Sequence, residues 1–361
     1  MRSRVSRWLC ARAFSSYLRV WVDIAFTDVI VSAIAIHLVK SKEIEMLTRT
    51  PFTDLSARMD GRVVTPADGD WDAIRQVFNL TKDFRPAAMA LPLGAADVEA
   101  AVGYAAANGL RVAPQATGHN AMPYGDLGDA LVVDVRNMQE VSIDIAARRV
   151  RVGAGVKWES VTPQLSEHGL AALHGSSPDV GIAGYSLGGG LGWLARKHGL
   201  QANAVTAIEL VTADGDSTRV DAERQPDLFW ALRGGNGNYG VVTALEFEVH
   251  PVDELYAGVM FFPFERAAEV LHAWVDLSPT VPEEMMMWAK LMQFPDAPDV
   301  PEPVRGRSFP LAFGAFLGGQ GEGSAWLAPL RELGPDIDTF AMVPPASLGD
   351  MAMDPNDPLP Y

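Results

Sequence analysis

The sequence is almost free of cysteine. Its 361 residues include only one, Cys10, so an internal disulfide framework and any zinc site built on cysteines are excluded. A chain without disulfides fits a reducing compartment, and we expect a cytoplasmic protein.

Positive charge is also scarce. Lysine and arginine together number 29 against 45 acidic residues, which gives a formal net charge of −16. Such acidity disfavours nucleic acid and anionic membrane surfaces as partners. No run of like charges stands out, so the acidic residues indicate a solvated surface, and a small molecule is the expected partner.

An uninterrupted hydrophobic run of membrane-spanning length is missing too. The apolar stretch 18–39 contains three charged residues, namely Arg19, Asp23 and Asp28. Each would cost about 2.5–3.5 kcal/mol near the middle of a bilayer, and the stretch lacks the early apolar core of a signal peptide. A transit peptide fits, but we favour a translation start at Met46, which leaves residues 1–45 without a structural role.

Apolar residues and glycine are abundant. The chain is 48% hydrophobic and holds 33 glycines and 25 prolines, which is typical of a globular α/β or α+β enzyme with a real core and many turns. Its length suggests two domains. We expect a lead-in at 46–84, a first domain at 85–251 and a second domain at 252–361.

In the first domain, short apolar runs alternate with segments whose apolar residues have the spacing of a helix. Helical spacing predicts a helix over 95–108 that ends at Gly109, and further helices over 158–167 and 229–233. Asp214–Gly215 is a strong hairpin signal. Strands are expected at 89–93, 110–114, 130–135, 141–145, 150–152, 205–212, 217–220 and 241–250.

The second domain has a different pattern. Strands are expected at 259–264, 285–294, 309–317 and 337–343, and amphipathic helices at 265–277 and 323–333. This order predicts an antiparallel sheet with helices on one face. Alternation along 285–294 places Lys290 on the same face as Met286 and Trp288.

The richest segment for chemistry is the glycine-rich stretch 181–193. Glycine has no Cβ, so backbone N–H groups there can approach a pyrophosphate closely. A Rossmann fingerprint is disfavoured, because the last gap among Gly188, Gly190 and Gly192 is wrong and no apolar strand leads into them.

The same stretch contains a hydrolase-like motif. Residues 184–188 match G-x-S-x-G, with Ser186 as the nucleophile and His198 and His250 downstream. That motif requires a buried strand directly before the serine, whereas residues 176–183 are poor strand material. A serine hydrolase therefore remains the weaker alternative.

Two further segments accompany the glycine-rich stretch. In 112–125 a strand runs into a tight turn that contains Gly118 and presents His119. In 233–243 a glycine-rich loop enters a strand, which again permits close approach of the backbone to a ligand.

These three segments, in this order and spacing, resemble the FAD-binding domain shared by vanillyl-alcohol oxidase, p-cresol methylhydroxylase (PCMH) and berberine bridge enzyme-like proteins. The resemblance covers about 85–251. It implies an α+β fold: a two-subdomain PCMH-type FAD-binding domain, followed by an incomplete antiparallel-sheet substrate domain with covering helices. It also implies an oxidoreductase that moves hydride from an alcohol, sugar or related metabolite to FAD, with dioxygen or another acceptor reoxidising the flavin.

The resemblance extends to individual residues. The turn 116–120 is expected to wrap the pyrophosphate, with His119 bonded to the 8α-methyl group of the flavin. Many berberine bridge enzyme-like members add a second bond from a cysteine where this chain has Ser177, so a single attachment is expected. Val180 occupies a position that gates oxygen access to the flavin in relatives; a valine there is compatible with an oxidase and would equally serve as packing. The residues expected to bind FAD are Ala116, Thr117, Gly118, His119, Asn120, Tyr124, Ser177, Pro178, Val180, Gly181, Gly184, Tyr185, Gly188, Gly189, Gly192, Asn238, Gly240 and Val242.

No catalytic base is assigned. In relatives the base usually comes from the substrate domain or from a C-terminal return segment beyond the point where this chain stops, so we expect a truncated product or a relocated base. Tyr124, Lys290 and Gln293 are weak candidates for the flavin face, and a surface lysine is the favoured interpretation of Lys290. A flavin-binding chain without turnover is therefore the second hypothesis for function.

Overall fold

The structure is a computed structural model that describes residues 52–298 and 300–360, and one compact unit begins at Thr53. Cys10 and the predicted extension 1–45 lie outside the described residues. No helix within the described ranges is long and apolar enough to cross a bilayer. The proposed domain limits stay predictions.

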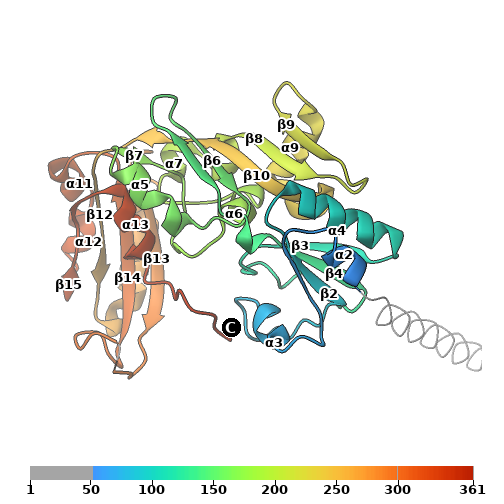
Figure 1. The fold of residues 1–361 in the computed structure, drawn as a ribbon. Coiled ribbons are helices and arrows are strands. Elements are labelled where there is room, and N and C mark those ends of the chain that lie inside the picture. Colours follow the sequence, from blue (N-terminus) through green and yellow to red (C-terminus); the bar gives the residue numbers. More distant parts are fainter. Residues whose placement is uncertain (1–51, 299, 361) are drawn as a thin grey trace, which may run out of the picture. The chain divides into compact units, whose positions relative to one another are not determined.

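The first sheet is mostly parallel (Figure 1). Its order is β1-β2-β4-β3, and β2, β4 and β3 are parallel whereas β1 is antiparallel to β2. Helix α4 connects β2 to β3 and buries the predicted apolar stripe, including Val98 and Val102. The bounds are β1 Arg62–Val64, β2 Ala88–Leu91, β3 Arg111–Gln115, β4 Ala130–Asp134, α2 Thr53–Ser56, α3 Trp71–Ile74 and α4 Ala95–Ala107.

The second sheet is antiparallel and has the order β5-β6-β10-β8-β9. The hairpin predicted at Asp214–Gly215 is confirmed, because β8 pairs with β9, and β5 likewise pairs with β6. The long strand β10 lies between β6 and β8. The bounds are β5 Val141–Asp144, β6 Arg149–Gly153, β8 Val205–Val211, β9 Ser217–Asp221, β10 Val241–Glu248, and α9 Pro226–Gly235 before β10.

The segment between β6 and β8 carries several short helices. The continuous helix predicted over 158–167 is wrong: a 3-10 turn, Trp158–Ser160, precedes α5. Pro163 explains the break, since it has no N–H to donate back into the preceding turn and is tolerated only in a first helical turn. The bounds are α5 Thr162–Ser166, β7 Leu170–Ala171, α6 Ile182–Leu187, α7 Ala195–His198 and α8 Gln201–Ala204.

The third sheet is antiparallel, with the order β13-β14-β12-β15 and β16 also paired with β12. The single strand predicted over 337–343 is wrong. It is split into β15 and β16 where Phe340 crosses the backbone of Gly258 closely, and Thr339 Oγ1 there accepts a hydrogen bond from the Val259 N–H at 2.9 Å. The bounds are β12 Leu255–Phe261, β13 Met285–Gln293, β14 Ser308–Phe316, β15 Ile337–Asp338 and β16 Ala341–Val343. Outside this sheet, β11 His250–Pro251 pairs with β7.

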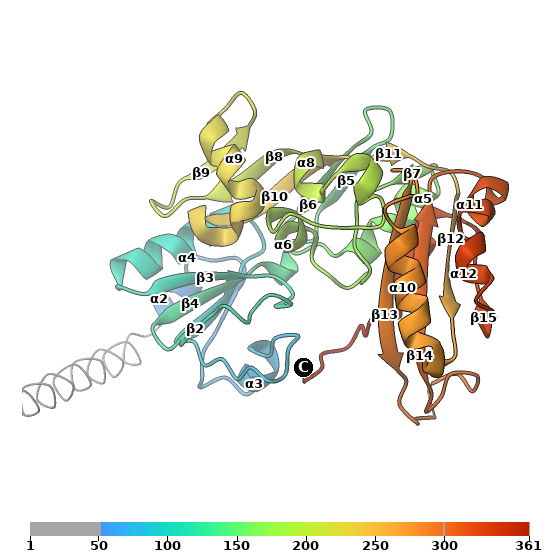
Figure 2. The same ribbon diagram turned by 180° about the vertical axis from the view of Figure 1, so that it is seen from behind.

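Alternate residues of β12 serve two cores. Tyr256 and Met260, with Phe262 directly after the strand, pack against helices on one face, which confirms the predicted helical layer (Figure 2). Leu255, Ala257, Val259 and Phe261 face the other way, into a cluster with Trp193 and Leu194 of the glycine-rich segment. The strand is therefore buried on both sides. The helices of the first face are α10 Ala267–Leu277, α11 Gln320–Trp326 and α12 Ala328–Arg331, whereas α13 Leu348–Met351 packs in the second cluster.

Candidate functional site

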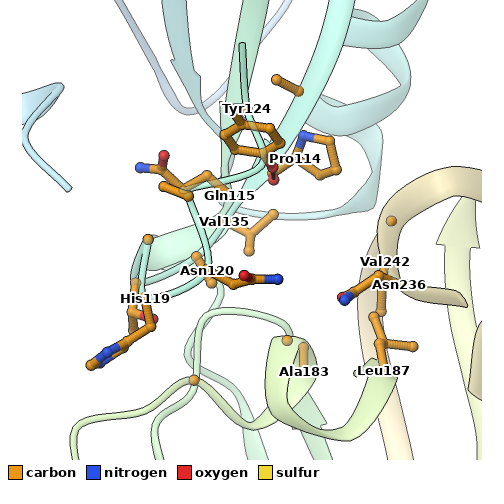
Figure 3. Close-up of a pocket in the computed structure, with 18 of the residues that line it drawn as sticks. Pro114, Gln115, His119, Asn120, Tyr124, Val135, Ala183, Leu187, Asn236 and Val242 are labelled. Atoms are coloured by element: carbon orange, nitrogen blue, oxygen red, sulfur yellow. Dashed lines mark hydrogen bonds between the residues drawn. The ribbon is translucent and has the colours of Figure 1, made fainter. Parts of the chain in front are cut away.

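The three segments singled out in the sequence meet around one cavity of about 630 Å³ (Figure 3). Residues 111–127 line one side, residues 180–187 the second and residues 236–242 the third, with Val135 and Ala154 completing the lining. This volume lies within the range of sites that hold small molecules and cofactors.

The loop 116–120 offers unused backbone donors. Gly118 has φ +77°, in the left-handed region, and a Cβ there would lie 3.0 Å from the Cβ of Val77. Within the described residues, the N–H groups of residues 117–120 donate no hydrogen bond. Successive free amides around a left-handed glycine form a concavity that suits an anion such as a pyrophosphate.

A buried polar network holds the base of this loop. Asp134 at the end of β4 is fully buried, and its Oδ2 accepts from Nε2 of Gln115 at 3.0 Å. Arg136 donates its backbone N–H to Oδ1 and its guanidinium to Oδ2 of the same carboxylate. A buried carboxylate needs such partners, so this network keeps the strand ends and the loop in register.

His119 is fixed on two sides. Its ring stacks on Phe78 with 3.8 Å between centroids, and its Nε2 lies 3.0 Å from Oδ2 of Asp179. Burial lowers the pKa of His119, although the carboxylate of Asp179 opposes this shift. The imidazole is therefore neutral near pH 7, which is the form that can act as a nucleophile.

The third wall depends on close backbone packing. Gly240 has φ +150°, and a Cβ there would overlap the carbonyl oxygen of Val211. Asn238 donates its side-chain amide to the carbonyl of Gly235 at 2.7 Å, and Asn236 adopts φ +58°. Asparagine tolerates this left-handed conformation better than most residues, so the loop keeps its backbone against the cavity.

Most of the predicted FAD-binding residues line this cavity. Five do not: Ser177, Pro178, Gly188, Gly189 and Gly192. Contact with FAD stays a prediction for all of the predicted residues, those in the lining included. Residues that sequence reasoning missed include Pro114, Gln115, Val135, Ala183, Leu187 and Asn236 (Figure 3). Those at strand ends or beside a predicted glycine could have been found, because backbone neighbours of a ligand loop usually share its lining.

The tyrosines of the cavity use their hydroxyls within the protein. Tyr124 donates to the carbonyl oxygen of Pro114, and burial raises the pKa of Tyr124. Tyr185 donates to the carbonyl of Leu173 at 3.0 Å, and burial raises its pKa as well. With its hydroxyl engaged and its proton held tightly, Tyr124 is a poor candidate for a catalytic base.

A second cavity of about 190 Å³ lies between the glycine-rich segment and strand β13. Its lining consists of Ser176, Leu191, Met286, Trp288, Lys290, Ala352 and Asp354. Lys290 points into it and pairs with Asp354 at 2.7 Å, so the interpretation as a surface lysine is wrong. Alternation had left open which face of the strand was inward. Gln293 is exposed and lines neither cavity.

Asp354 is the acceptor at the centre of this second cavity. Ser176 donates to its Oδ2 at 2.5 Å and Ser177 at 3.1 Å, while Lys290 donates to Oδ1. Burial alone would raise the pKa of Asp354, but these hydrogen bonds lower it below its usual range. The carboxylate is therefore ionised at neutral pH and accepts hydrogen bonds only.

The geometry does not support the serine hydrolase alternative. Ser186 is fully buried inside α6, and a loop rather than a strand precedes that helix. Its Oγ has no hydrogen-bond partner among the described residues, so no histidine is placed to activate it. A nucleophile requires both exposure and a base within hydrogen-bond reach.

Stability should fall as the pH drops below neutral. Burial lowers the pKa of four histidines, His119, His174, His198 and His250, from 6.5, and that of His250 to about 4. The unfolded chain then binds protons that the folded chain excludes, so this stability is full above pH 6.5 and is lost as the pH falls towards 4. We expect a lower Tm at about pH 5 than at about pH 7, by thermal denaturation.

A variant of one histidine separates the contribution of His250 to the pH dependence of Tm from other effects of pH. Titration towards the pI reduces the repulsion of a chain with net charge −16, which acts in the opposite direction. His250→Asn removes one excluded proton and should therefore make the fall in Tm shallower than in the wild type. If Tm falls with pH equally steeply in the wild type and in His250→Asn, His250 contributes nothing to the pH dependence of stability.

Comparisons with known proteins agree with this geometry. Residues 86–221 match the family model described as an FAD binding domain. (R)-6-hydroxynicotine oxidase of Paenarthrobacter nicotinovorans is 38% identical over 192 residues, covering 53% of this chain and 42% of that protein. Xylooligosaccharide oxidase of Thermothelomyces thermophilus is 31% identical over 227 residues, covering 60% and 46%. The chain thus spans less than half the length of these two relatives.

Solved structures show the same likeness. The crystal structure of 6-hydroxy-D-nicotine oxidase from Arthrobacter nicotinovorans matches with a TM-score of 0.73 and 30% identity, covering 84% of this chain and 65% of that one. BBE-like 1 of Physcomitrella patens matches with a TM-score of 0.70 and 26% identity, covering 81% and 62%.

The residues present fit the cofactor that these comparisons imply. The free amides of 117–120 form one wall of the cavity. Gly181 and Gly240, which have no side chains, contribute backbone to the two other walls. Such a lining suits a long, phosphate-bearing ligand. Residues 86–221 are thus an FAD-binding domain with FAD as its cofactor, and the chain is similar to FAD-linked oxidases and to a BBE-like protein.

Proposed function

We propose that the chain acts as an FAD-dependent oxidoreductase that takes a hydride from an alcohol, sugar or related metabolite, with the flavin tethered to His119. The observation that carries the proposal is the placement of His119. It lines the FAD cavity next to the free amides of 117–120, and its ring is fixed by Phe78 and Asp179. Ser177 cannot form a thioether, so one attachment is proposed.

The residues of the chain would divide the work. The amides of 117–120 would bind the pyrophosphate, and the backbone at Gly181 and Gly240, which lines the cavity, would hold the rest of the cofactor. Bound FAD supplies the two-electron acceptor for hydride. A covalent bond to His119 would prevent loss of the cofactor. Val180, a small residue in the lining, is compatible with dioxygen as the final acceptor.

The second cavity is the proposed substrate side. It lies at Ser176, next to Ser177, where relatives bond the flavin through a cysteine. Leu191, Met286 and Trp288 form an apolar wall, and the ionised Asp354 can accept a hydrogen bond from a hydroxyl group. Two relatives are named for hydroxynicotine and for xylooligosaccharide, which both carry hydroxyl groups on rings. We propose a substrate of that broad class, and a cytoplasmic location stays a prediction.

Flavin should remain with the acid-precipitated protein in the wild type. Removing the nucleophile in His119→Ala leaves no atom for the bond, so the flavin should pass into the supernatant. The measurement is visible flavin absorbance of pellet and supernatant after acid precipitation. Matched His168→Ala, on a histidine outside the cavity lining, should behave as wild type. Yellow supernatant from the wild type would keep FAD binding and contradict the tether.

Turnover is tested separately from binding. Under anaerobic conditions, a hydroxylated ring substrate should bleach the flavin absorbance of the loaded protein, and oxygen should restore it. Bound flavin that no candidate substrate reduces would favour the alternative, a flavin-binding chain without turnover. The outcome therefore separates the two hypotheses without changing any residue.

A further inference from the structure

Asp179 is a buried carboxylate whose role the proposed function leaves open. The residue is 5% exposed, and its Oδ2 lies 3.0 Å from Nε2 of His119. Its Oδ1 is buried and has no hydrogen-bond partner among the described residues. A buried, half-satisfied carboxylate costs free energy, so packing alone is a poor reason for its presence.

The contact with Asp179 determines which nitrogen of His119 is free. As the acceptor in this contact, the carboxylate of Asp179 takes a hydrogen bond from Nε2, so the proton of the neutral imidazole sits on Nε2. Nδ1 then carries the lone pair, and it takes part in no hydrogen bond within the described ranges. The stacked ring of Phe78 fixes the plane of the imidazole, while Asp179 fixes its rotation within that plane.

A carboxylate in this position also increases the reactivity of the ring. Carboxylates behind a histidine raise the basicity of its other nitrogen, as they do in metal sites and in catalytic triads. The other charged group near His119 is Lys157, which pairs with Glu159 at 3.3 Å and disfavours an imidazolium. Because Ser177 offers no thiolate, His119 is the nucleophile whose activation matters.

We propose that Asp179 is the positioning residue for covalent flavin attachment: it holds His119 as the Nε2–H tautomer and presents Nδ1 as the bond-forming atom. This inference rests on the proposed tether. The bond joins Nδ1 to the 8α carbon, one C–H bond of the methyl group breaks, and the Nε2 proton leaves to Asp179. Two electrons pass into the flavin and then to dioxygen, which becomes hydrogen peroxide by taking up the proton of the broken C–H bond and the proton that Asp179 passes on.

The test compares wild type with Asp179→Ala and Asp179→Asn in the full chain. After addition of FAD to apoprotein, the rate at which flavin becomes resistant to acid extraction should fall about tenfold or more in Asp179→Ala. Reversible FAD binding, measured by quenching of flavin fluorescence, should change little. Asparagine keeps an acceptor oxygen but takes up no proton, so Asp179→Asn should retain the tautomer and still attach flavin slowly.

A second readout is independent of flavin. The ¹⁵N chemical shifts of His119 in the apoprotein should show a protonated Nε2 and a bare Nδ1 in the wild type and in Asp179→Asn, and a mixture in Asp179→Ala. Attachment at the wild-type rate in Asp179→Ala, or a protonated Nδ1 in the wild type, would overturn the inference. If the wild type holds only dissociable FAD, the proposed tether is contradicted. The ¹⁵N shifts then still decide whether Asp179 fixes the tautomer of the His119 imidazole.

Discussion

Replacing Gly192 with alanine should destabilise the protein severely. A Cβ at this position would overlap the carbonyl oxygen of His174 and would also lie 2.9 Å from the hydroxyl of Tyr185. The obstruction is backbone, which cannot move aside as a flexible side chain would. Overpacking of this kind costs about 3 kcal/mol or more, and we expect a Tm lower by roughly 6 °C or more.

The matched control is Gly103→Ala. Gly103 lies inside α4, and a Cβ there would meet nothing within 4 Å. Alanine in a helix interior is better than glycine by about 0.5–1 kcal/mol, so this variant should be as stable as wild type or more stable. Thermal and urea unfolding of both FAD-loaded variants would give the comparison. Equal stability of the two variants would contradict close packing at Gly192.

In the segment 181–193, the need for glycine could be predicted from the sequence, but the group that each glycine faces could not. Glycines there indicated close approach of the backbone to a pyrophosphate, and Gly181 and Gly184 do line the cavity. Gly192, however, is pressed against His174 of the protein itself. The requirement for a missing Cβ is the same in both cases, so a sequence pattern alone cannot tell a ligand from a neighbouring carbonyl.

Secondary structure was predictable where one signal dominated. The stripe of α4 and the hairpin β8–β9 followed from periodicity and from Asp214–Gly215. The errors came from competing effects: Pro163 interrupts a pattern that is otherwise helical, and the passage of Phe340 over Gly258 divides a strand. The second effect is tertiary, so no local pattern carries it.

The partners of the site residues were beyond prediction for the same reason. His119 was identified from its loop, but Asp179 is 60 residues away and was considered only as poor strand material. Lys290 and Asp354 are 64 residues apart, and their pairing depends on how two segments fold onto each other. Residues whose roles depend on such contacts carry no periodic or motif signal of their own.

Replacing Trp193 with alanine should give a comparable or larger loss of stability. Trp193 is 1% exposed, and its ring lies 3.7 Å from that of Trp288 and 6.4 Å from that of Phe313, between centroids. It joins the glycine-rich segment to the third sheet. Truncating a buried tryptophan costs about 3–5 kcal/mol, because burial is lost and a cavity remains. Unfolding of the FAD-loaded protein in urea should show a lower midpoint.

The chain supplies its own control in Trp230. This residue is 75% exposed, so Trp230→Ala should change the free energy of unfolding by about 0.5 kcal/mol or less. Trp193→Phe keeps an aromatic ring and should recover part of the loss. Because Trp288 also lines the second cavity, Trp193→Ala should weaken substrate binding beyond its effect on stability. If Trp193→Ala and Trp230→Ala unfold at the same urea concentration, the glycine-rich segment does not depend on this contact with the sheet, and Trp288 must be held by its own strand.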